Sequence, residues 1–172
     1  MVVTVTDRVS LDAVRRALSQ VMDPEIPVVS IVDLGIVRAV EWRGDALHVT
    51  LTPTYSACPA TDVIRNDVIA AMRGIGVDDV QVGVQLAPAW TTDWVAPEAR
   101  RKLREYGIAP PGVASSRVDV SGIGPFRTRP VVPCPRCDSK ATTLIAQFGS
   151  TSCKALYRCD DCREPFDYFK PL

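Results

Sequence analysis

Cys134-Pro-Arg-Cys137 and Cys159-Asp-Asp-Cys162 are the two stretches that decide the fold of the C-terminal part of this 172-residue chain. Each is a knuckle of two thiols two residues apart, and 21 residues separate the knuckles. Two such knuckles satisfy the tetrahedral, four-coordinate preference of Zn²⁺. A segment of about 40 residues has too small a core to fold unaided, so bound metal would supply the missing stability. The spacing therefore predicts a zinc ribbon.

The donor set of this ribbon leaves two alternatives to zinc. Iron can occupy the same cage of four thiolates, and without a metal the four cysteines could form two disulfides or be unrelated thiols. Cys58 is the only cysteine outside the last 40 residues, and Cys153 fits neither knuckle, so we treat Cys153 as a bystander whose role stays open. A closed site of four thiolates is typical of a structural metal rather than a catalytic one.

The N-terminal sequence has no basic region followed by an apolar run and a cleavage site, and no stretch approaches the length of a membrane span. We therefore expect a cytoplasmic protein without a membrane partner. Thiols stay reduced in that compartment, which favours metal ligation over disulfides.

Charge is balanced, with 20 basic and 20 acidic side chains. Residues 1–113 carry 11 Lys and Arg against 14 Asp and Glu, and residues 131–172 carry 6 against 5. Neither part is a basic patch, and Asp160 and Asp161 lie inside a knuckle. A nucleic-acid partner is therefore disfavoured, because phosphate contacts need clustered cations.

Hydrophobic periodicity predicts an α+β domain ahead of the ribbon. We expect two layers, with helices on a mixed sheet of three to four strands. The expected domains are residues 1–113 for the α+β domain, 114–130 for a linker and 131–172 for the ribbon. The predicted elements are a helix from Ser10 to about Met22, a hairpin of 35–42 and 46–52, a helix over 60–73, a strand over 80–86 and a helix over 97–106.

Local patterns refine this domain. In the second helix Val63, Ile64, Val68 and Met72 are expected to face inward. His48 is expected on the polar face of its strand, as a solvated residue rather than a ligand. Two prolines between Asp23 and Pro27 predict an extended acidic loop instead of a paired strand.

Cys58 lies in the loop before the second helix, with Pro59 suited to the first helical position. The amide groups and the positive dipole end of that helix would favour the thiolate, making Cys58 a nucleophile and a ligand for soft metals. Asp23 and Glu25 could reach the same end of the sheet, which would give a transient iron site. The alternatives are a small buried cysteine, and carboxylates that are merely solvated. For Asp33, an Asx-type hydrogen bond to the backbone of a turn is as good an interpretation as a functional role.

The segment Trp90-Thr-Thr-Asp93-Trp94 places two tryptophans in an irregular stretch. Trp90, Asp93 and Trp94 could cover a pocket or form a partner surface, although filling the core is an equal alternative for the tryptophans. No nucleotide loop, Ser-His-Asp arrangement or metallohydrolase motif is present. We therefore do not expect autonomous catalysis.

Several of these stretches resemble one family. They are Asp-Pro-Glu-Ile-Pro-Val-Val-Ser-Ile-Val-Asp-Leu-Gly-Ile-Val from Asp23, Thr-Tyr-Ser-Ala-Cys-Pro-Ala from Thr54, Pro-Ala-Trp-Thr-Thr-Asp-Trp from Pro88, Phe-Gly-Ser-Thr-Ser-Cys-Lys-Ala-Leu-Tyr-Arg-Cys from Phe148, and Glu-Pro-Phe-Asp-Tyr-Phe from Glu164. The chain resembles the PaaD (PaaJ) family of phenylacetate catabolism. Its N-terminal part alone resembles the wider SufT-like family of iron–sulfur assembly factors. One departure is Pro171, where relatives often have a cysteine after the lysine.

The resemblance implies an accessory subunit of the multicomponent monooxygenase that epoxidises phenylacetyl-CoA, without a catalytic di-iron site of its own. It implies a role in maturing iron or iron–sulfur centres of the other subunits, which would be partners together with the assembly machinery. Cys58 matches the family's reactive cysteine, Asp23 and Glu25 its acidic motif, and the four knuckle cysteines its metal ligands. A structural subunit that scaffolds the oxygenase is the alternative, and a homodimer stays open.

Overall fold

The computed structural model describes residues 8–56, 58–112 and 131–171. The chain divides into two compact units at Trp90 and Thr91. The expected linker over 114–130 lies outside the described residues, and the expected domain ranges stay a prediction. In the part of the chain that the structure describes, no helix combines the length and hydropathy needed to cross a membrane.

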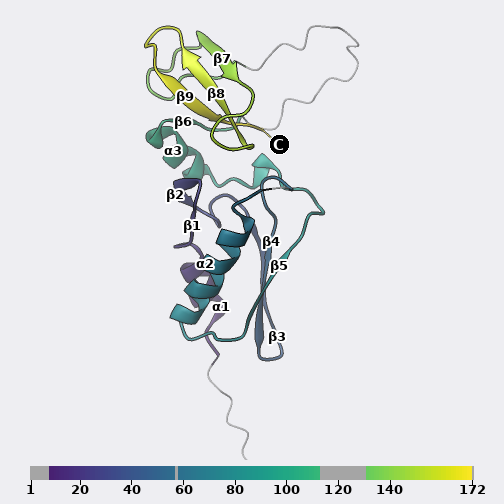
Figure 1. Ribbon diagram of the computed structural model, residues 1–172. Helices are drawn as coiled ribbons and strands as arrows, with labels where there is room; N and C mark the ends of the chain where they lie inside the picture. The colour runs from purple at the N-terminus through teal and green to yellow at the C-terminus, as the bar shows by residue number, and fades with distance from the viewer. Residues whose placement is uncertain (1–7, 57, 113–130, 172) are drawn as a thin grey trace, which may run out of the picture. The chain divides into compact units, whose positions relative to one another are not determined.

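The first unit has two layers, as the hydrophobic pattern predicted. Helices α1 and α2 lie on one face of the sheet β3-β4-β5, in which β4 pairs antiparallel with β3 and parallel with β5 (Figure 1). A separate two-stranded hairpin, β1-β2, precedes this sheet. The elements are α1 (Leu11–Leu18), β1 (Met22–Asp23), β2 (Ile26–Ser30), β3 (Val37–Arg43), β4 (Ala46–Leu51), α2 (Thr61–Gly74) and β5 (Val80–Val84).

Helix α1 begins as expected but ends early. The Ser10 hydroxyl caps it by accepting a hydrogen bond from the Ala13 backbone N–H. The helix stops at Leu18 rather than near Met22, because Met22 pairs with Ser30 in the β1–β2 hairpin. The prediction that the Asp23–Pro27 stretch forms no paired strand was therefore wrong. Prolines are tolerated here because an isolated two-stranded pair leaves both outer edges unbonded.

The β3–β4 hairpin and the buried side of α2 confirm most of the predicted pattern. Gly44 turns the hairpin with a positive φ of 59°, a conformation that favours glycine. The side chains of Leu47, Val49 and Leu51 are buried, and His48 lies between them on the other face. The inward prediction was wrong for Val63, which is 47% exposed, because the buried stripe of α2 follows Ile64 at intervals of four residues instead.

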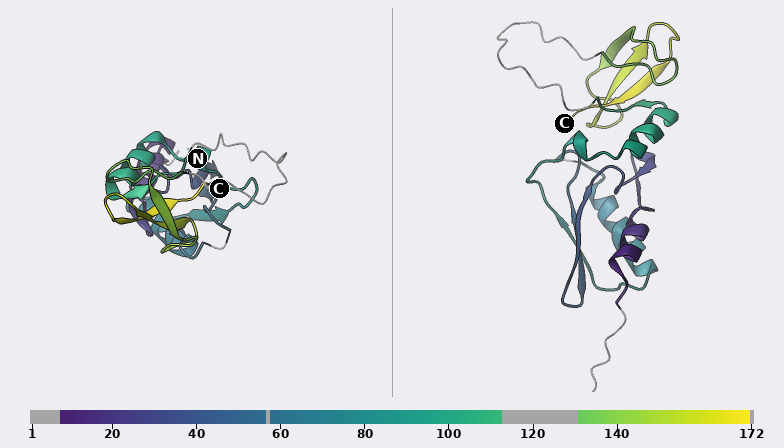
Figure 2. Two further views of the ribbon diagram at one scale, coloured as in Figure 1. Left: turned by 90° about the horizontal axis from the view of Figure 1, so that it is seen from above. Right: turned by 180° about the vertical axis from the view of Figure 1, so that it is seen from behind.

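The second unit contains α3 and the ribbon. Its elements are the 3-10 turn η1 (Thr92–Trp94), α3 (Pro97–Tyr106), β6 (Ile108–Ala109), β7 (Thr142–Ala146), β8 (Lys154–Cys159) and β9 (Pro165–Phe169). The four strands form a sheet in the order β6-β9-β8-β7 (Figure 2). Tyr157, Phe166 and Tyr168 form its aromatic core, with ring centroids 5.9 and 5.7 Å from that of Tyr157. Their burial gives the ribbon a small core of its own.

Strand β6 ties α3 to the ribbon. Helix α3 ends at Gly107, whose φ of 95° is the left-handed conformation typical of a glycine cap. The chain then pairs at once with β9, in parallel, through Ile108 and Ala109. The guanidinium of Arg104 also forms an ion pair with Asp138, the residue after the first knuckle. The ribbon sheet therefore includes residues that come well before its first cysteine.

Candidate metal centre and the Cys58 pocket

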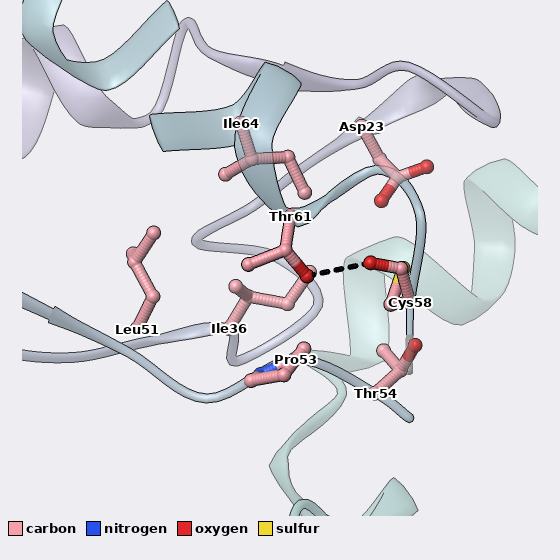
Figure 3. A pocket seen from close by; sticks show the side chains of 8 residues that line it. All are labelled: Asp23, Ile36, Leu51, Pro53, Thr54, Cys58, Thr61 and Ile64. Atoms are coloured by element: carbon pink, nitrogen blue, oxygen red, sulfur yellow. Dashed lines mark hydrogen bonds between the residues drawn. The ribbon is translucent and has the colours of Figure 1, made fainter. Parts of the chain in front are cut away.

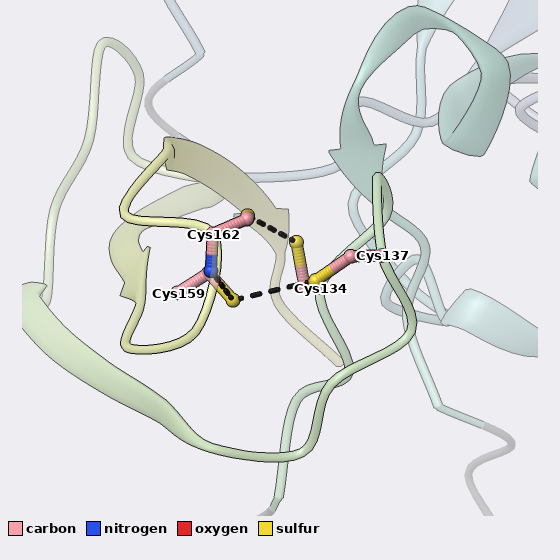
Figure 4. Close-up of side chains that lie close together, drawn as sticks. All are labelled: Cys134, Cys137, Cys159 and Cys162. Atoms are coloured by element: carbon pink, nitrogen blue, oxygen red, sulfur yellow. Dashed lines mark hydrogen bonds between the residues drawn. The ribbon is translucent and has the colours of Figure 1, made fainter.

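The four knuckle cysteines converge. Their sulfur atoms all lie within 4.8 Å of one another, with Cys134 and Cys162 3.8 Å apart and Cys137 and Cys159 3.5 Å apart (Figure 4). Tetrahedral ligation with Zn–S bonds of about 2.3 Å requires sulfur separations of roughly 3.8 Å. These residues therefore fit a single ion. In the described residues they are the only group of three or more potential metal ligands held this closely.

Backbone amides favour the thiolate in both knuckles, although burial and the neighbouring sulfurs raise the pKa of the Cys137 and Cys162 thiols overall. Each knuckle is followed directly by a residue with positive φ, Asp138 at 62° and Arg163 at 66°. The Cys162 backbone N–H points at the Cys159 sulfur at 3.4 Å. This amide, together with that of Asp161, lowers the pKa of the Cys159 thiol to about 7. N–H donors of this kind stabilise the charge that a metal-bound sulfur carries.

Cys58 lines a small hollow in the first unit. The thiol is half-buried, and the side chain of Asp23 beside it is only 7% exposed. The hollow has room for one water-sized sphere, about 10 Å³. It is lined by Asp23, Ile36, Leu51, Pro53, Thr54, Cys58, Thr61 and Ile64 (Figure 3). The site thus combines one thiol and one carboxylate with an apolar wall.

The turn that precedes α2 holds Cys58 in place. Its N–H donates to the Tyr55 carbonyl at 3.0 Å, and its carbonyl accepts from both the N–H and the hydroxyl of Thr61, at 3.2 and 2.9 Å (Figure 3). Thr61 is a site residue that the sequence analysis missed. Its position three residues after Cys58, at the start of a helix, was the available signal, because hydroxyl side chains commonly bond the backbone there.

The electrostatics of Cys58 differ from the expectation. Burial raises the pKa of the Cys58 thiol, and the negative charges of Asp23 and Glu25 add to the rise. The Ala60 backbone N–H and the Thr61 side chain lower it, but they do not compensate. The predicted helix-end donor is thus present, while the predicted net stabilisation of the thiolate was wrong. Without a cation at the sulfur, the protonated thiol is favoured at neutral pH.

The two carboxylates of the acidic motif, Asp23 and Glu25, lie in different environments. One carboxylate oxygen of Asp23 accepts from the N–H groups of Glu25 and Ile26, each at 2.9 Å, and so closes the turn between β1 and β2. Glu25 is exposed and does not line the hollow. Asp33 engages in turn chemistry, because its N–H donates to the Ser30 hydroxyl and its carboxylate accepts from the Ser30 N–H.

The residues of the tryptophan segment, Trp90 to Trp94, belong to different units. Trp90 is 5% exposed, and its indole N–H donates to the Leu34 carbonyl at 2.9 Å, so this side chain packs in the core of the first unit. Asp93 is exposed and Trp94 is half-buried, both in η1 of the second unit. Cys153 is half-buried with its sulfur 3.1 Å from the Thr151 hydroxyl, and it is not part of the metal cluster.

Comparison with known proteins finds a family model that matches part of each unit. Residues 11–86 match the family described as "Iron-sulfur cluster assembly protein", and residues 120–170 match the "PaaD zinc beta ribbon domain". Nearly the whole chain also matches one Escherichia coli (strain K12) protein, which is named as a subunit of the "Putative 1,2-phenylacetyl-CoA epoxidase". The two are 56% identical over 153 residues, which cover 89% of this chain and 88% of that protein.

The chain belongs to the PaaD family. The first unit of this PaaD-family protein also has shorter relatives. A "Fe-S protein maturation auxiliary factor" from Porphyromonas gingivalis is 38% identical over 90 residues, covering 51% of this chain and 85% of that protein. The crystal structure of a domain of unknown function, DUF59, from Bacillus anthracis has a TM-score of 0.50 at 28% identity, covering 54% of this chain and 89% of that one. The SufT-like resemblance of the N-terminal part is thereby confirmed.

Proposed function

We propose that this protein is an accessory subunit of a 1,2-phenylacetyl-CoA epoxidase that helps to mature the iron or iron–sulfur centres of the other subunits. Cys58, together with Asp23, binds the iron that is to be delivered, which is the cargo of this protein. Zn²⁺ held by the four knuckle cysteines keeps the ribbon folded. The observation that carries the proposal is the hollow in which the Cys58 thiol and the buried Asp23 carboxylate lie together.

The relatives support this assignment from two directions. The E. coli protein that shares nearly the whole chain is named as a subunit of that epoxidase, and the relatives of the first unit alone are named as Fe–S maturation factors. A protein that joins both parts fits a maturation factor dedicated to one oxygenase. Its partners are then the metal-containing subunits and the assembly machinery that supplies them.

The chemistry of the hollow suits a cargo that must leave again. Iron is a borderline metal that accepts both thiolate and carboxylate ligands. Two protein donors are too few to complete its coordination shell, so the remaining positions stay available to water or to a receiving protein. The raised pKa of the Cys58 thiol adds to this, because a proton competes with the metal for the sulfur. Weak, exchangeable binding is what delivery requires.

The ribbon site has the opposite character. Four sulfurs at tetrahedral spacing leave no open position, so a metal there has a structural role. Zn²⁺ supplies such a site with stability and has no redox chemistry of its own. The side chains of Cys134 and Cys159 are fully buried, which slows exchange of the ion.

The test replaces Cys58 in cells that depend on this protein for growth on phenylacetate. We expect Cys58→Ala to lower both the iron content and the activity of the purified epoxidase, while the variant protein accumulates normally. Cys153→Ala is the matched control, because it removes a half-buried thiol outside both sites and is expected to leave iron and activity unchanged.

The same experiment separates delivery from scaffolding. If Cys58→Ala leaves iron content and activity normal, the maturation role is wrong. A scaffold would then have to depend on exposed side chains such as Asp93, and Asp93→Lys would release the oxygenase in a pull-down experiment.

A further inference from the structure

Strand β5 is an open edge of the three-stranded sheet. The order β3-β4-β5 leaves the outer side of β5 without a partner strand among the described residues (Figure 1). Asp79 accepts from the Leu47 N–H with its carbonyl, and Gln85 donates its own N–H to the Leu51 carbonyl. Odd-numbered residues of the strand thus direct their backbone groups at β4. The N–H and C=O groups of Val80, Val82 and Val84 therefore point outward.

This edge lacks the features that normally prevent strands from pairing. Proteins protect open edges with lysines, prolines or bulges, but residues 80–86 read Val-Gln-Val-Gly-Val-Gln-Leu without a charge or a proline. The side chain of Val84 is 44% exposed, although Val84 pairs in register with the buried Leu51 of β4, and Leu86 just beyond the strand is 56% exposed. The opposite edge differs, because β3 carries Arg38, Glu41 and Arg43.

The sequence of this edge is nearly palindromic about Gly83. Valine stands on both sides of Gly83, glutamine stands at 81 and 85, and the apolar residues Val80 and Leu86 stand at the ends. An antiparallel strand with the same sequence therefore matches it residue for residue. Self-complementarity of this kind is what an interface related by a two-fold axis requires, because one patch must meet its own copy.

We propose that two copies of this protein pair through β5, antiparallel and centred on Gly83, so that their sheets join into one. Val82 then lies opposite Val84 of the second copy, and both have outward backbone groups that can exchange two hydrogen bonds. Gln81 lies opposite Gln85 of the second copy. Gly83 faces its own copy at a non-hydrogen-bonded position, where Cα atoms approach to about 4.5 Å.

Several contacts would stabilise this pairing. The outward N–H and C=O groups exchange water for protein partners, and the exposed side chains of Val84 and Leu86 meet apolar neighbours. Gly83 has no side chain where the two backbones come closest. No like charges oppose each other, because Asp78 and Asp79 at one end of the strand face the neutral stretch that follows Leu86.

Cross-linking tests the register. A Cβ added at Gly83 meets no atom within 4 Å in the single chain, so Gly83→Cys should fold normally. Non-hydrogen-bonded antiparallel pairs have Cα separations that disulfides span. Under diamide, which takes up the two hydrogens of the paired thiols, we expect Gly83→Cys to become a covalent dimer. Gln81→Cys is the control on the same strand, because residue 81 lies opposite Gln85 of the second copy and not opposite another cysteine. We expect this variant and the unmodified protein to remain largely unlinked.

Sedimentation velocity tests the pairing itself. We expect the mass of the unmodified protein to shift from one chain towards two as its concentration rises. Val84→Lys should raise the dimer dissociation constant at least about tenfold, or about 1.4 kcal/mol. Ala39→Lys, an equal charge at an exposed position of the opposite edge strand, should leave it unchanged. A monomer at every concentration, or a dimer indifferent to Val84→Lys, overturns the proposal.

Discussion

At Cys58, opposing local effects set the charge of a single sulfur atom. Burial and the carboxylate of Asp23 disfavour the thiolate, while the Ala60 amide and the Thr61 side chain favour it. An arriving cation changes this balance, because it neutralises the repulsion from Asp23 and displaces the proton. The residue is thus suited to ionise when metal is present and to stay protonated when it is absent.

Two substitutions should shift this balance in opposite directions. Asp23→Asn removes a charge that raises the pKa of the Cys58 thiol, so that pKa should fall and alkylation at neutral pH should accelerate. Thr61→Val removes a donor that lowers the same pKa, so alkylation should slow. The measurement is the pH profile of iodoacetamide labelling, followed by mass spectrometry of the peptide that contains Cys58.

Cys153 in the same samples is the internal reference, since its labelling should not respond to either change. Equal profiles for both variants would show that Asp23 and Thr61 do not control the thiol. The experiment reads protonation alone, so its outcome is independent of any metal.

Single residues were predictable from sequence where spacing alone carries the chemistry. The four knuckle cysteines followed from two cysteine pairs with the same spacing, because a two-residue gap brings both thiols of a knuckle to one ion. The sign of the pKa shift at Cys58 was not predictable. That sign depends on how deeply the Cys58 thiol is buried against Ile36 and Leu51, which is a property of tertiary packing.

At the scale of elements, the segment after β5 shows how one side chain fixes a connection. The indole of Trp90 fills space in the first unit and satisfies the carbonyl of Leu34, which is itself buried. A buried carbonyl without a donor is costly, so this single hydrogen bond restrains the direction in which the chain leaves β5.

We expect Trp90→Phe to destabilise the first unit by about 1–3 kcal/mol, because the aromatic ring is largely kept while the Leu34 carbonyl loses its donor. The measurement is urea unfolding followed by circular dichroism, with metal retention by the ribbon as the check that the second unit is intact. An unchanged midpoint would mean that water replaces the indole, and that Trp90 does not restrain this segment.

Long periodic elements were predicted well and short pairs were not. Helices α2 and α3 and the β3–β4 hairpin follow from hydrophobic alternation and from glycines at their turns. The β1–β2 hairpin was missed because two prolines suggested an unpaired loop. Strand β6 has only two residues, Ile108 and Ala109, and its pairing with β9 depends on a contact distant in sequence that no local pattern records.

At the scale of the whole molecule, the two units differ in how they gain stability. The first unit buries a continuous aliphatic core of helices against a sheet. The second has a small aromatic core, and four thiols that would lie unliganded beside it without metal. We therefore expect binding of a structural metal ion to be coupled to folding in the second unit, where these four thiols lie.

Removal of the metal by a chelator should consequently unfold one unit only. We expect hydrogen exchange to accelerate across β7, β8 and β9, and also in β6 and α3, because β6 pairs with β9 and Arg104 binds Asp138. Residues 8–90 should keep their protection. Mass-spectrometric hydrogen exchange, with elemental analysis to confirm that the metal is gone, makes the measurement.

Unchanged protection in the metal-free ribbon would contradict this coupling. Loss of protection in β7–β9 without any change in α3 would limit the metal-dependent unit to the residues that follow the first knuckle. That second result would favour the domain range expected from sequence, which begins the ribbon at residue 131.

The parallel pairing of β6 with β9 has a topological consequence. The chain joins the ribbon sheet at Ile108, and the side chain of Val132 is buried in the ribbon core. Both ends of the intervening stretch are thus anchored in one small body. A protease that cut the main chain once between residues 113 and 130 would leave two fragments still held by strand pairing, so a nicked protein need not fall apart.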